Sequence, residues 1–137
     1  MKKHTISKSQ YVKGLQCPKA LWLYRHRKDL APEITPEKQA LFDTGHEVGE
    51  LAMRYFGDGV EVTNEYWDVK GAVEATQQYI NDGHDLIFEA TAIHPIDGSY
   101  ARIDILKRVE GSDEWDLIEV KSSTSVKDYH IDDMSFQ

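Results

Sequence analysis

Two carboxylates and one lysine in the last third of the sequence, Asp104, Glu119 and Lys121, are residue types that could support hydrolytic chemistry. Carboxylate oxygens are preferred ligands of hard divalent cations such as Mg²⁺ and Mn²⁺. Such a cation can lower the pKa of a water molecule and polarise a phosphoryl oxygen. A nearby lysine can orient that water or stabilise developing negative charge. The alternative interpretation is that all three are solvated charges on an exposed surface.

The segments around these residues predict a β-hairpin that would bring them together. Residues 98–108 and 114–121 alternate in side-chain character and are rich in β-branched and aromatic residues, with a polar turn at 110–113. Side chains alternate between the two faces of a strand, so Glu119 and Lys121 should share one face. We therefore expect Asp104, Glu119 and Lys121 to converge on one side of a small sheet, with the two carboxylates close enough to share one ion.

The same residues resemble a known family. Asp104, followed after about fifteen residues by Glu119-Val120-Lys121-Ser122-Ser123, is similar to the motif of the PD-(D/E)XK nuclease superfamily, in particular its RecB-like exonuclease branch, which includes the CRISPR-associated RecB-like nucleases. The resemblance implies a restriction-endonuclease-like core and metal-dependent hydrolysis of phosphodiester bonds in nucleic acid, with DNA favoured over RNA. It implies that Asp104, Glu119 and the Val120 carbonyl hold Mg²⁺ or Mn²⁺, and that Lys121 positions the attacking water.

Further metal ligands are less clearly marked. RecB-like nucleases carry a metal-binding His four residues after a helical Gly, but here the residue four after Gly45 is Gly49. His46 and Glu50, also four apart, are the alternative ligands, unless both are ordinary surface residues. The two glycines are expected to allow close approach of their helix to the sheet. Glu89 lies inside a strongly apolar run, which suggests a paired or metal-linked carboxylate.

Both ends of the chain carry additional likenesses to this family. In several RecB-like nucleases one early and three late cysteines hold an iron–sulfur cluster, which needs four thiolates. This sequence has only Cys17, so either Cys17 is a small buried residue or the other ligands lie beyond residue 137. Gln137 is similar to a catalytic Gln on the family's last core helix. Because the family core adds a strand after that helix, we expect the chain to be a fragment of a longer protein. The resemblance to the N-terminal cysteine segment of the RecB-like nucleases covers Cys17-Pro18-Lys19-Ala20-Leu21-Trp22-Leu23.

Positive charge is concentrated at the start of the chain, although the net charge is −8. Residues 1–28 contain eight Lys or Arg and no Asp or Glu, whereas residues 29–137 contain eight Lys or Arg and all 24 acidic residues. A basic segment beside an acidic body can contact a polyanion or dock on the protein's own acidic surface, and both interpretations stay open. The first expects four residues to contact nucleic acid along the groove leading to the carboxylates: Lys13, Lys19, Arg25 and Arg27.

The remaining pattern predicts one α/β domain over residues 1–137, with a small mixed sheet flanked by helices and a basic helical arm at 1–28. Strands are expected at 60–62 and 86–93 in addition to the hairpin. Helices are expected at 8–15, from 18 to about 27, from 36 to about 56, at 69–80 and from 127 or 128 onward, with Ser7 and Asp68 as N-caps. The helix from 36 carries a predicted apolar stripe at Leu41, Val48, Leu51, Ala52 and Tyr55.

Composition limits the function classes. No apolar run approaches the roughly 20 residues that span a membrane, and the single cysteine excludes an internal disulfide and suits the reducing cytoplasm. The intact set of Asp104, Glu119 and Lys121 favours an enzyme. The negative net charge favours a catalytically inactive nuclease-fold domain that binds nucleic acid or another protein. A third alternative is an unrelated acidic interaction domain in which the motif is a coincidence.

Overall fold

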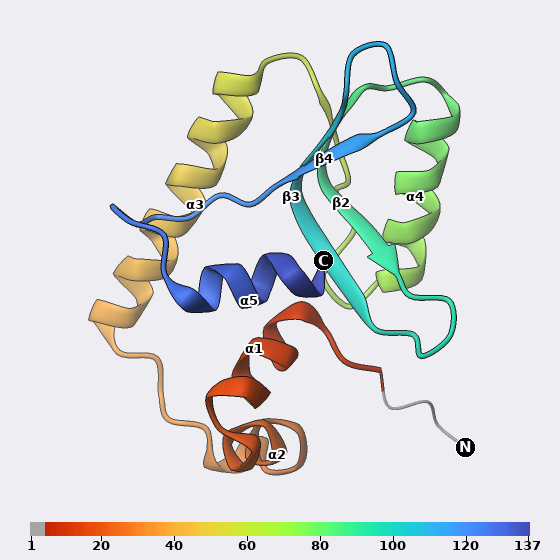
Figure 1. Cartoon of the computed structure of the whole chain (residues 1–137). Helices are drawn as coiled ribbons and strands as arrows, with labels where there is room; N and C mark the ends of the chain where they lie inside the picture. The colour runs from red at the N-terminus through yellow and green to blue at the C-terminus, as the bar shows by residue number, and fades with distance from the viewer. Residues whose placement is uncertain (1–4) are drawn as a thin grey trace.

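The computed structural model describes residues 5–137 and contains helices on both sides of a small sheet (Figure 1). Residues 1–4, which include Lys2 and Lys3 of the basic arm, lie outside the described residues. The elements in chain order are α1 (Lys8–Gln16), α2 (Pro18–His26), the 3₁₀ helix η1 (Lys28–Leu30), α3 (Pro36–Phe56), β1 (Val60–Glu61), α4 (Val69–Asn81), β2 (Leu86–Ile93), β3 (Tyr100–Arg108), β4 (Trp115–Ile118) and α5 (Asp128–Phe136).

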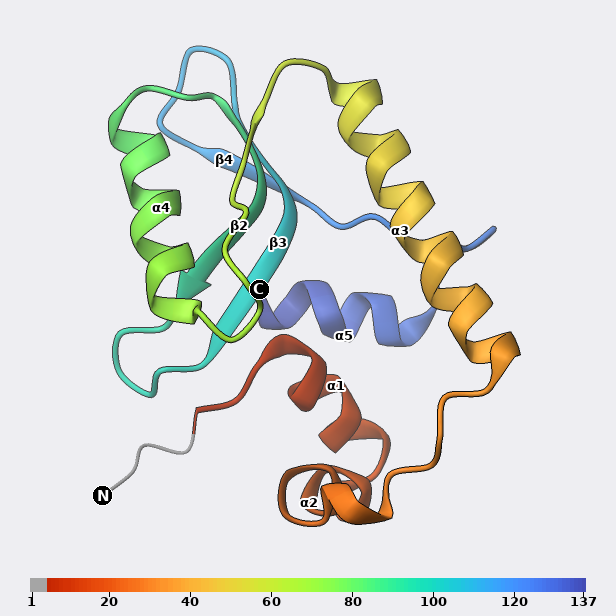
Figure 2. The ribbon, with the colours of Figure 1, turned by 180° about the vertical axis from the view of Figure 1, so that it is seen from behind.

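The four strands form one mixed sheet in the order β1-β2-β3-β4, which confirms the predicted α/β class. Strand β1 is parallel to β2, whereas β2 and β3, and β3 and β4, are antiparallel. Figure 2 shows α4 and α3 on opposite sides of the sheet, with α1 and α5 together near one end of β3. Helices therefore lie on both sides and at one end of the sheet (Figure 2).

Side-chain caps fix the helix starts close to where the sequence predicts them. The Ser7 side chain accepts a hydrogen bond from Gln10 N, and the Gln10 side chain accepts one from Ser7 N, which makes a capping box at α1. Thr35 accepts from Lys38 N at the start of α3, and Asp68 accepts from Gly71 N at the start of α4. Each cap satisfies a backbone N–H that has no partner within the helix.

The hydrophobic core lies between the sheet and α4. Its buried members come from the loop after β1, from α4 and from the two central strands: Val62, Ala72, Ile87, Ala90, Ile103 and Leu106. A buried polar contact joins the same two layers, because the Thr91 N–H donates to Thr76 Oγ1 at 2.8 Å. Thr76 Oγ1 donates in turn to the Ala72 carbonyl at 2.8 Å. This pair of hydrogen bonds connects α4 to β2 and fixes the position of the helix along the strand.

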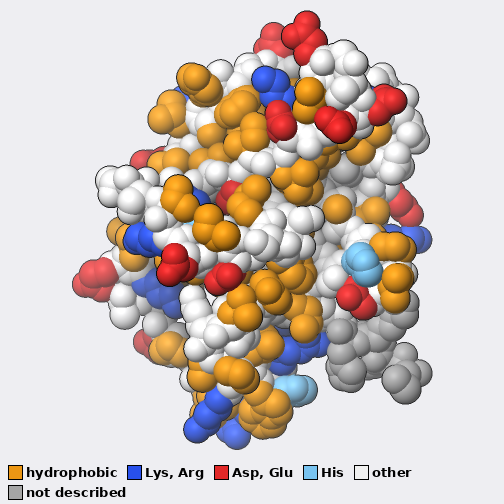
Figure 3. Space-filling model, in the orientation of Figure 1, with side chains coloured by type: hydrophobic (Ala, Val, Ile, Leu, Met, Phe, Trp, Pro, Cys, Tyr) orange, Lys and Arg blue, Asp and Glu red, His pale blue; other side chains and the backbone are white. Residues whose placement is uncertain are grey.

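Helix α3 has no buried residue, although the sequence predicts an apolar stripe along it; of that stripe, Val48 and Ala52 are half-buried. Leu41 is 71% exposed, Leu51 60% and Tyr55 84%. Figure 3 shows hydrophobic side chains reaching the surface across much of the visible face. Over residues 5–137, no helix is both long enough and apolar enough to cross a membrane.

The start of the described chain is anchored to the sheet. Tyr100 N, at the first residue of β3, donates to the Ile6 carbonyl at 3.0 Å, and Ser7 forms a parallel bridge with Tyr100. Helix α1 begins directly after this bridge and packs against α5, where the rings of Tyr11 and Phe136 stack at 4.8 Å. The anchor therefore brings the first turn of α1 beside the end of the sheet.

Candidate functional site

The predicted hairpin is confirmed, and it places Asp104 opposite Glu119. Ile105 pairs with Ile118 in the antiparallel register of β3 and β4, so Glu119, the residue after Ile118, falls opposite Asp104. Strand β4 ends at Ile118, so Glu119 and Lys121 lie just beyond the last residue of the strand. Beyond the end of β4, the chain stays connected to β3 through a side chain, because Val120 N donates a hydrogen bond to Asp104 Oδ2 at 2.7 Å.

Asp104, Glu119 and Lys121 line one cavity of about 610 Å³ between α3 and the sheet. Its walls come from α3, from the segment after β1, from β2 and β3, and from the chain that leaves β4. Two basic residues, Arg102 and Lys121, face an excess of acidic ones. The five carboxylates that line the cavity are Glu50, Glu61, Glu89, Asp104 and Glu119.

Among the described residues, Glu119 accepts more hydrogen bonds than any other of these carboxylates. Lys8 Nζ donates to its Oε1 at 3.1 Å and its Oε2 at 2.9 Å. Lys121 Nζ also donates to Oε1, and Gln137 Nε2 donates to Oε2 at 2.9 Å. The side chain of Glu119 is only 6% exposed, so three donors replace the water that it loses.

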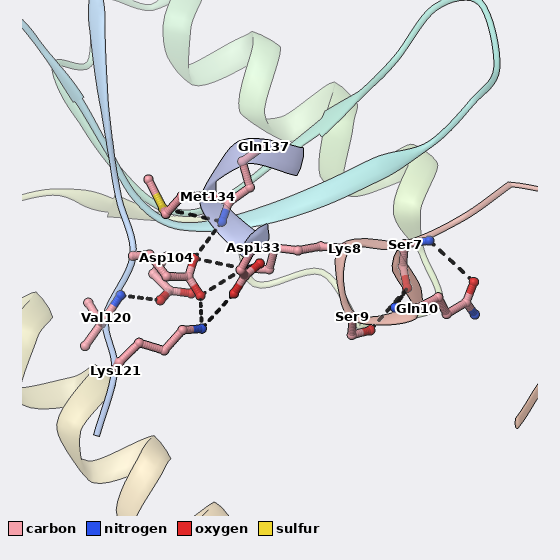
Figure 4. Close-up of polar contacts among 11 residues, drawn as sticks. Ser7, Lys8, Ser9, Gln10, Asp104, Val120, Lys121, Asp133, Met134 and Gln137 are labelled. Carbon is pink, nitrogen blue, oxygen red and sulfur yellow. Dashed lines mark hydrogen bonds and ion pairs between the residues drawn. The ribbon is translucent and has the colours of Figure 1, made fainter. Parts of the chain in front are cut away.

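Helix α5 supplies a second acid to the same network. Asp133 Oδ2 accepts a hydrogen bond from Lys121 Nζ at 2.9 Å, and Asp133 Oδ1 lies 3.8 Å from Lys8 Nζ. Two lysines therefore bridge Glu119 and Asp133 (Figure 4). Two buried oxygens in this cluster, Asp133 Oδ1 and Gln137 Oε1, accept no hydrogen bond from the described residues. Buried acceptors without a donor favour binding of a further donor or cation here.

Burial and mutual repulsion shift the titration of the carboxylates. Burial raises the pKa of Asp104, and the negative charge of Glu119 raises it further, against the opposing hydrogen bond from Val120 N. Burial likewise raises the pKa of Glu89, to which the charge of Asp104 adds. Burial pushes the pKa of Glu119 upward, but hydrogen bonds from Lys121 and Lys8 outweigh it and leave that pKa lowered. The pKa of Lys121 is raised, because its bonds to Asp133 and Glu119 outweigh burial.

Glu89 occupies its place through an unusual backbone conformation. Its φ of 55° makes it the one non-glycine residue with positive φ among residues 5–137. The register pairs Phe88 with Ile105 and Ala90 with Ile103, so Glu89 lies opposite Asp104 in β3. Ile87 and Ala90, which lie on either side of Glu89 and are three residues apart, both belong to the core, whereas strict alternation would place them on opposite faces. Such conformations cost about 1–3 kcal/mol and cluster at functional sites.

The donor set fits a hard divalent cation held by few protein ligands. Asp104, Glu119 and Val120 line the same cavity and offer carboxylate and carbonyl oxygens. A cation would relieve the repulsion that raises the pKa values of Asp104 and Glu89. Within the described part of the chain, no three His, Cys, Asp or Glu side chains are grouped closely enough to hold a metal ion. Such an ion would therefore keep waters in its coordination shell, as Mg²⁺ usually does in proteins.

The secondary ligand candidates lie on α3 and on β2. His46 and Glu50 both line the cavity from α3 and are exposed, and Glu89 faces them from the sheet. The expected close approach at Gly45 and Gly49 is wrong, because a Cβ atom at either position would meet none of the described neighbouring atoms within 4 Å. The glycines instead leave open space in the wall of the cavity. No Lys or Arg among the described residues forms a salt bridge with Glu89, so of the two expectations for it, a paired or a metal-linked carboxylate, the metal-linked one stays a prediction.

The basic arm meets the site through a residue that sequence reasoning did not select. None of the four predicted nucleic-acid contacts lines the acidic cavity itself in the described structure, but Arg25 lines a neighbouring cavity, so the expectation that the four border a groove leading to the carboxylates stays a prediction. Arg27 pairs with the exposed Asp29 at 2.7 Å, and Lys13 lies over the ring of Tyr24. Lys8 is the residue of the arm that reaches Glu119. The predicted contacts were Lys13, Lys19, Arg25 and Arg27.

Cys17 is exposed and forms no disulfide, so the interpretation of a small buried residue is wrong. It ends α1 and precedes Pro18, the first residue of α2. Its conformation is extended, which separates the two helices and lets them pack against each other. A single exposed thiol at a helix junction does not by itself indicate a metal centre.

Sequence reasoning identified Gln137 but missed Lys8 and Asp133. A signal for Asp133 exists, because it lies four residues before Gln137 and therefore on the same face of α5. Both side chains bond into the Glu119 network. Lys8 carries no comparable signal, since 111 residues separate it from Glu119. Its role depends on how α1 packs against the end of the sheet.

Comparison with protein-family models, with curated proteins and with solved structures gives no match. The assignment of function therefore rests on the geometry and electrostatics of this cavity.

Proposed function

We propose that this protein is a metal-dependent nuclease that hydrolyses phosphodiester bonds in nucleic acid, with DNA favoured over RNA. The observation that carries the proposal is the convergence of Asp104, Glu119 and Lys121 on one acidic cavity. Those three residues form the motif that resembles the PD-(D/E)XK nucleases. The register that sets Asp104 opposite Glu119 supports it, as does the backbone bond from Val120 to Asp104.

In this proposal Asp104, Glu119 and the Val120 carbonyl hold Mg²⁺ or Mn²⁺, with Glu89, His46 or Glu50 as further oxygen or nitrogen ligands. When bound, the cation supplies positive charge that polarises the phosphoryl oxygen and lowers the pKa of a water molecule. Lys121 acts as a charged hydrogen-bond donor, because its pKa is raised by Asp133 and Glu119. A lysine that keeps its proton can orient water or stabilise phosphate charge but cannot act as the general base.

Asp133 and Gln137 are positioning residues in this scheme. Asp133 accepts from Lys121 Nζ at 2.9 Å, and Glu119 accepts from the same ammonium group, so Lys121 is held between two carboxylates. Gln137 donates to Glu119 Oε2 at 2.9 Å and so orients that carboxylate. Neither needs to touch the substrate to influence the rate, because a ligand that is held in one orientation binds its ion more tightly.

A second candidate function is a catalytically inactive nuclease-fold domain that binds nucleic acid or a protein partner. The observation that favours it is the saturation of Glu119 by Lys8, Lys121 and Gln137. A carboxylate with three donors already has its charge compensated. A cation must then displace the Lys8 ammonium or bind beside it.

The deciding experiment is a cleavage assay on end-labelled DNA and RNA oligonucleotides with Mg²⁺, Mn²⁺ or EDTA. We expect cleavage with either cation and none with EDTA. Asp104→Asn and Glu119→Gln should each reduce the rate by about 100-fold or more, because each removes a negative oxygen ligand. The matched control is Asp116→Asn, which changes an exposed acid of β4 outside the cavity.

The two candidate functions predict different results in this assay. Cation-dependent cleavage that is lost in Asp104→Asn but kept in Asp116→Asn supports the nuclease. Absence of cleavage on every substrate, in a preparation that binds Mn²⁺ by calorimetry, supports the inactive binding domain. Cleavage that survives both Asp104→Asn and Glu119→Gln would contradict the assignment of the site.

A further inference from the structure

A second cavity of about 480 Å³ opens beside the first and has the opposite charge. Four basic residues line it, and no Asp or Glu does, although the chain as a whole has 24 acidic and 16 basic residues. The rest of its lining is polar or aromatic. We call this cavity the basic groove and define it by its cations: Lys8, Arg25, Lys28 and Arg102.

Three of these cations lack a carboxylate partner. Among the described residues, no salt bridge is formed by Arg25, Lys28 or Arg102. Arg25 is oriented instead by neutral acceptors, the Thr5 carbonyl at 2.9 Å and the Gln10 side chain at 3.2 Å. Unpaired cations that converge on a cavity in a net-negative protein favour an anionic ligand.

Tyrosine rings add a flat apolar surface to the same groove. Tyr24, Tyr66 and Tyr100 line it together with the cations. Tyr66 is 76% exposed, and its ring packs edge-on against Trp67 with centroids 4.9 Å apart. An exposed aromatic ring held in place by its neighbour is suited to stacking on a flat ligand. Cations combined with such rings are the surface that proteins use to bind a nucleotide strand.

The basic groove joins the acidic cavity at two residues. Arg102 lines both cavities and is held by a hydrogen bond from its Nη2 to the Asn64 carbonyl at 3.0 Å. Lys8 lines the groove, while its Nζ reaches Glu119 in the acidic cavity. A chain of phosphates could therefore run from the groove past Arg102, which lines both cavities, toward the carboxylates.

We propose that the basic groove is a subsite for one nucleotide of the strand, in which Arg25, Lys28 and Arg102 hold a phosphate and Tyr66 stacks on the base. The inference rests on the proposed function, because it supplies the substrate position next to the bond that is cut. It also explains how an acidic protein holds a polyanion: the carboxylates face the cation, and the phosphate beside it lies in a groove that is lined by cations and by no Asp or Glu.

The test is binding of fluorescein-labelled hexathymidylate, measured by fluorescence anisotropy in EDTA so that no cleavage occurs. Tyr66→Ala should weaken binding by on the order of tenfold, because it removes one stacking contact. Tyr66→Phe keeps the ring and should bind like the wild type. Lys28→Ala should weaken binding several-fold and reduce the salt dependence of the binding constant. Both positions are exposed, so these variants should fold normally.

Matched controls change the same residue types elsewhere. Tyr55→Ala removes a tyrosine that is 84% exposed on α3, and Lys70→Ala removes a lysine whose side chain is 89% exposed on α4. Both should bind hexathymidylate like the wild type. The proposed nucleotide subsite is refuted if the Tyr66→Ala and Lys28→Ala variants bind hexathymidylate as tightly as these controls. It is also refuted if the wild type does not bind hexathymidylate at all.

The failure of this inference is distinguishable from failure of the proposed function. Asp116→Asn should keep hexathymidylate binding in EDTA, because Asp116 is an exposed acid that lines neither the acidic cavity nor the groove. If binding depends on Tyr66 and Lys28 but no cleavage occurs, the proposed nucleotide subsite is supported and the proposed nuclease activity is contradicted. The opposite result is cleavage that is lost in Asp104→Asn, while Tyr66→Ala and Lys28→Ala change neither cleavage nor binding. That result would support the nuclease and contradict the proposed nucleotide subsite.

Discussion

The ammonium group of Lys8 lies 2.9 Å from Oε2 and 3.1 Å from Oε1 of Glu119, although 111 residues separate the two in the chain. Both side chains are largely shielded from water, with 17% and 6% exposed. Charged hydrogen bonds at such sites are stronger than those between neutral groups. Lys8 thus provides the positive charge next to Glu119 that a divalent cation would otherwise provide, and α1 is tied to the site by this bond.

The first prediction concerns competition between Lys8 and a cation. Lys8→Met keeps the length of the side chain but removes its charge, so Mn²⁺ no longer competes with an ammonium group for Glu119. We expect the dissociation constant for Mn²⁺, measured by titration calorimetry, to fall by roughly tenfold. Without metal, the free energy of unfolding should drop by about 1–3 kcal/mol, since Glu119 loses one of its charged donors.

Lys13→Met is the matched control for this prediction, because Lys13 lies on the same helix and does not line the acidic cavity. It should leave the Mn²⁺ dissociation constant unchanged. If Lys8→Met instead weakens Mn²⁺ binding as much as Glu119→Gln does, Lys8 supports the cation site rather than competing for it.

The second prediction separates the role of Lys121 from metal binding. Lys121→Ala removes a donor to Glu119 and Asp133 but no metal ligand. Mn²⁺ affinity should therefore hold or rise, while cleavage should fall by about 100- to 1,000-fold, as for loss of one stabilising donor in a transition state. Calorimetry and the cleavage assay on the same preparation measure both quantities. A loss of affinity equal to that of Asp104→Ala would contradict this division of roles.

The third prediction is a dependence of stability on pH that originates at Glu89. Because the pKa of Glu89 is raised above its ordinary value of 4.5 by burial and by Asp104, the folded chain keeps a proton that the unfolded chain has released. Stability from this group is therefore complete below about pH 4.5 and is lost as pH rises through the raised pKa. Asp104, whose pKa is also raised, acts in the same sense.

Glu89→Gln removes that titration, so its Tm should exceed the wild-type Tm at pH 7 by about 2–5 °C and converge on it near pH 4. Differential scanning fluorimetry in EDTA, with Glu110→Gln in the β3–β4 turn as the control, measures the difference. A lower Tm for Glu89→Gln at pH 7 would mean that attraction to Arg102 outweighs burial and repulsion.

The fourth prediction tests the polar tie between α4 and β2. Thr76→Val removes the oxygen that accepts from Thr91 N at 2.8 Å and leaves this buried N–H without a partner. We expect the free energy of unfolding in urea to fall by about 1–3 kcal/mol. Thr76→Ser keeps the hydroxyl and should lose much less. Equal losses in both variants would show that the methyl group, not the hydrogen bond, stabilises this position.

Much of the fold follows from patterns that are local in sequence. The hairpin from Tyr100 to Ile118 is visible in the alternation of two strands around a short polar turn. Helix starts are visible in their caps, as at Asp68. The position of Asp104 opposite Glu119 follows from the hairpin alone, because a short turn fixes the register between two strands. These features need only interactions between residues that are near in sequence.

The surroundings of the carboxylates depend on packing between distant segments, which no local pattern encodes. The approach of Lys8 requires α1 to be anchored at Tyr100, and the approach of Asp133 requires α5 to lie beside α1. The positive φ of Glu89 occurs between two strand segments that both contribute to the core, and no local pattern marks it. Helix periodicity likewise predicted an apolar stripe on α3, but burial of that stripe needs a partner surface, and this helix stands beside an open cavity. The sequence alone thus determined which groups could do the chemistry and which strands carry them, whereas the tertiary structure decided which charges surround them, because electrostatic partners are chosen by distance in space.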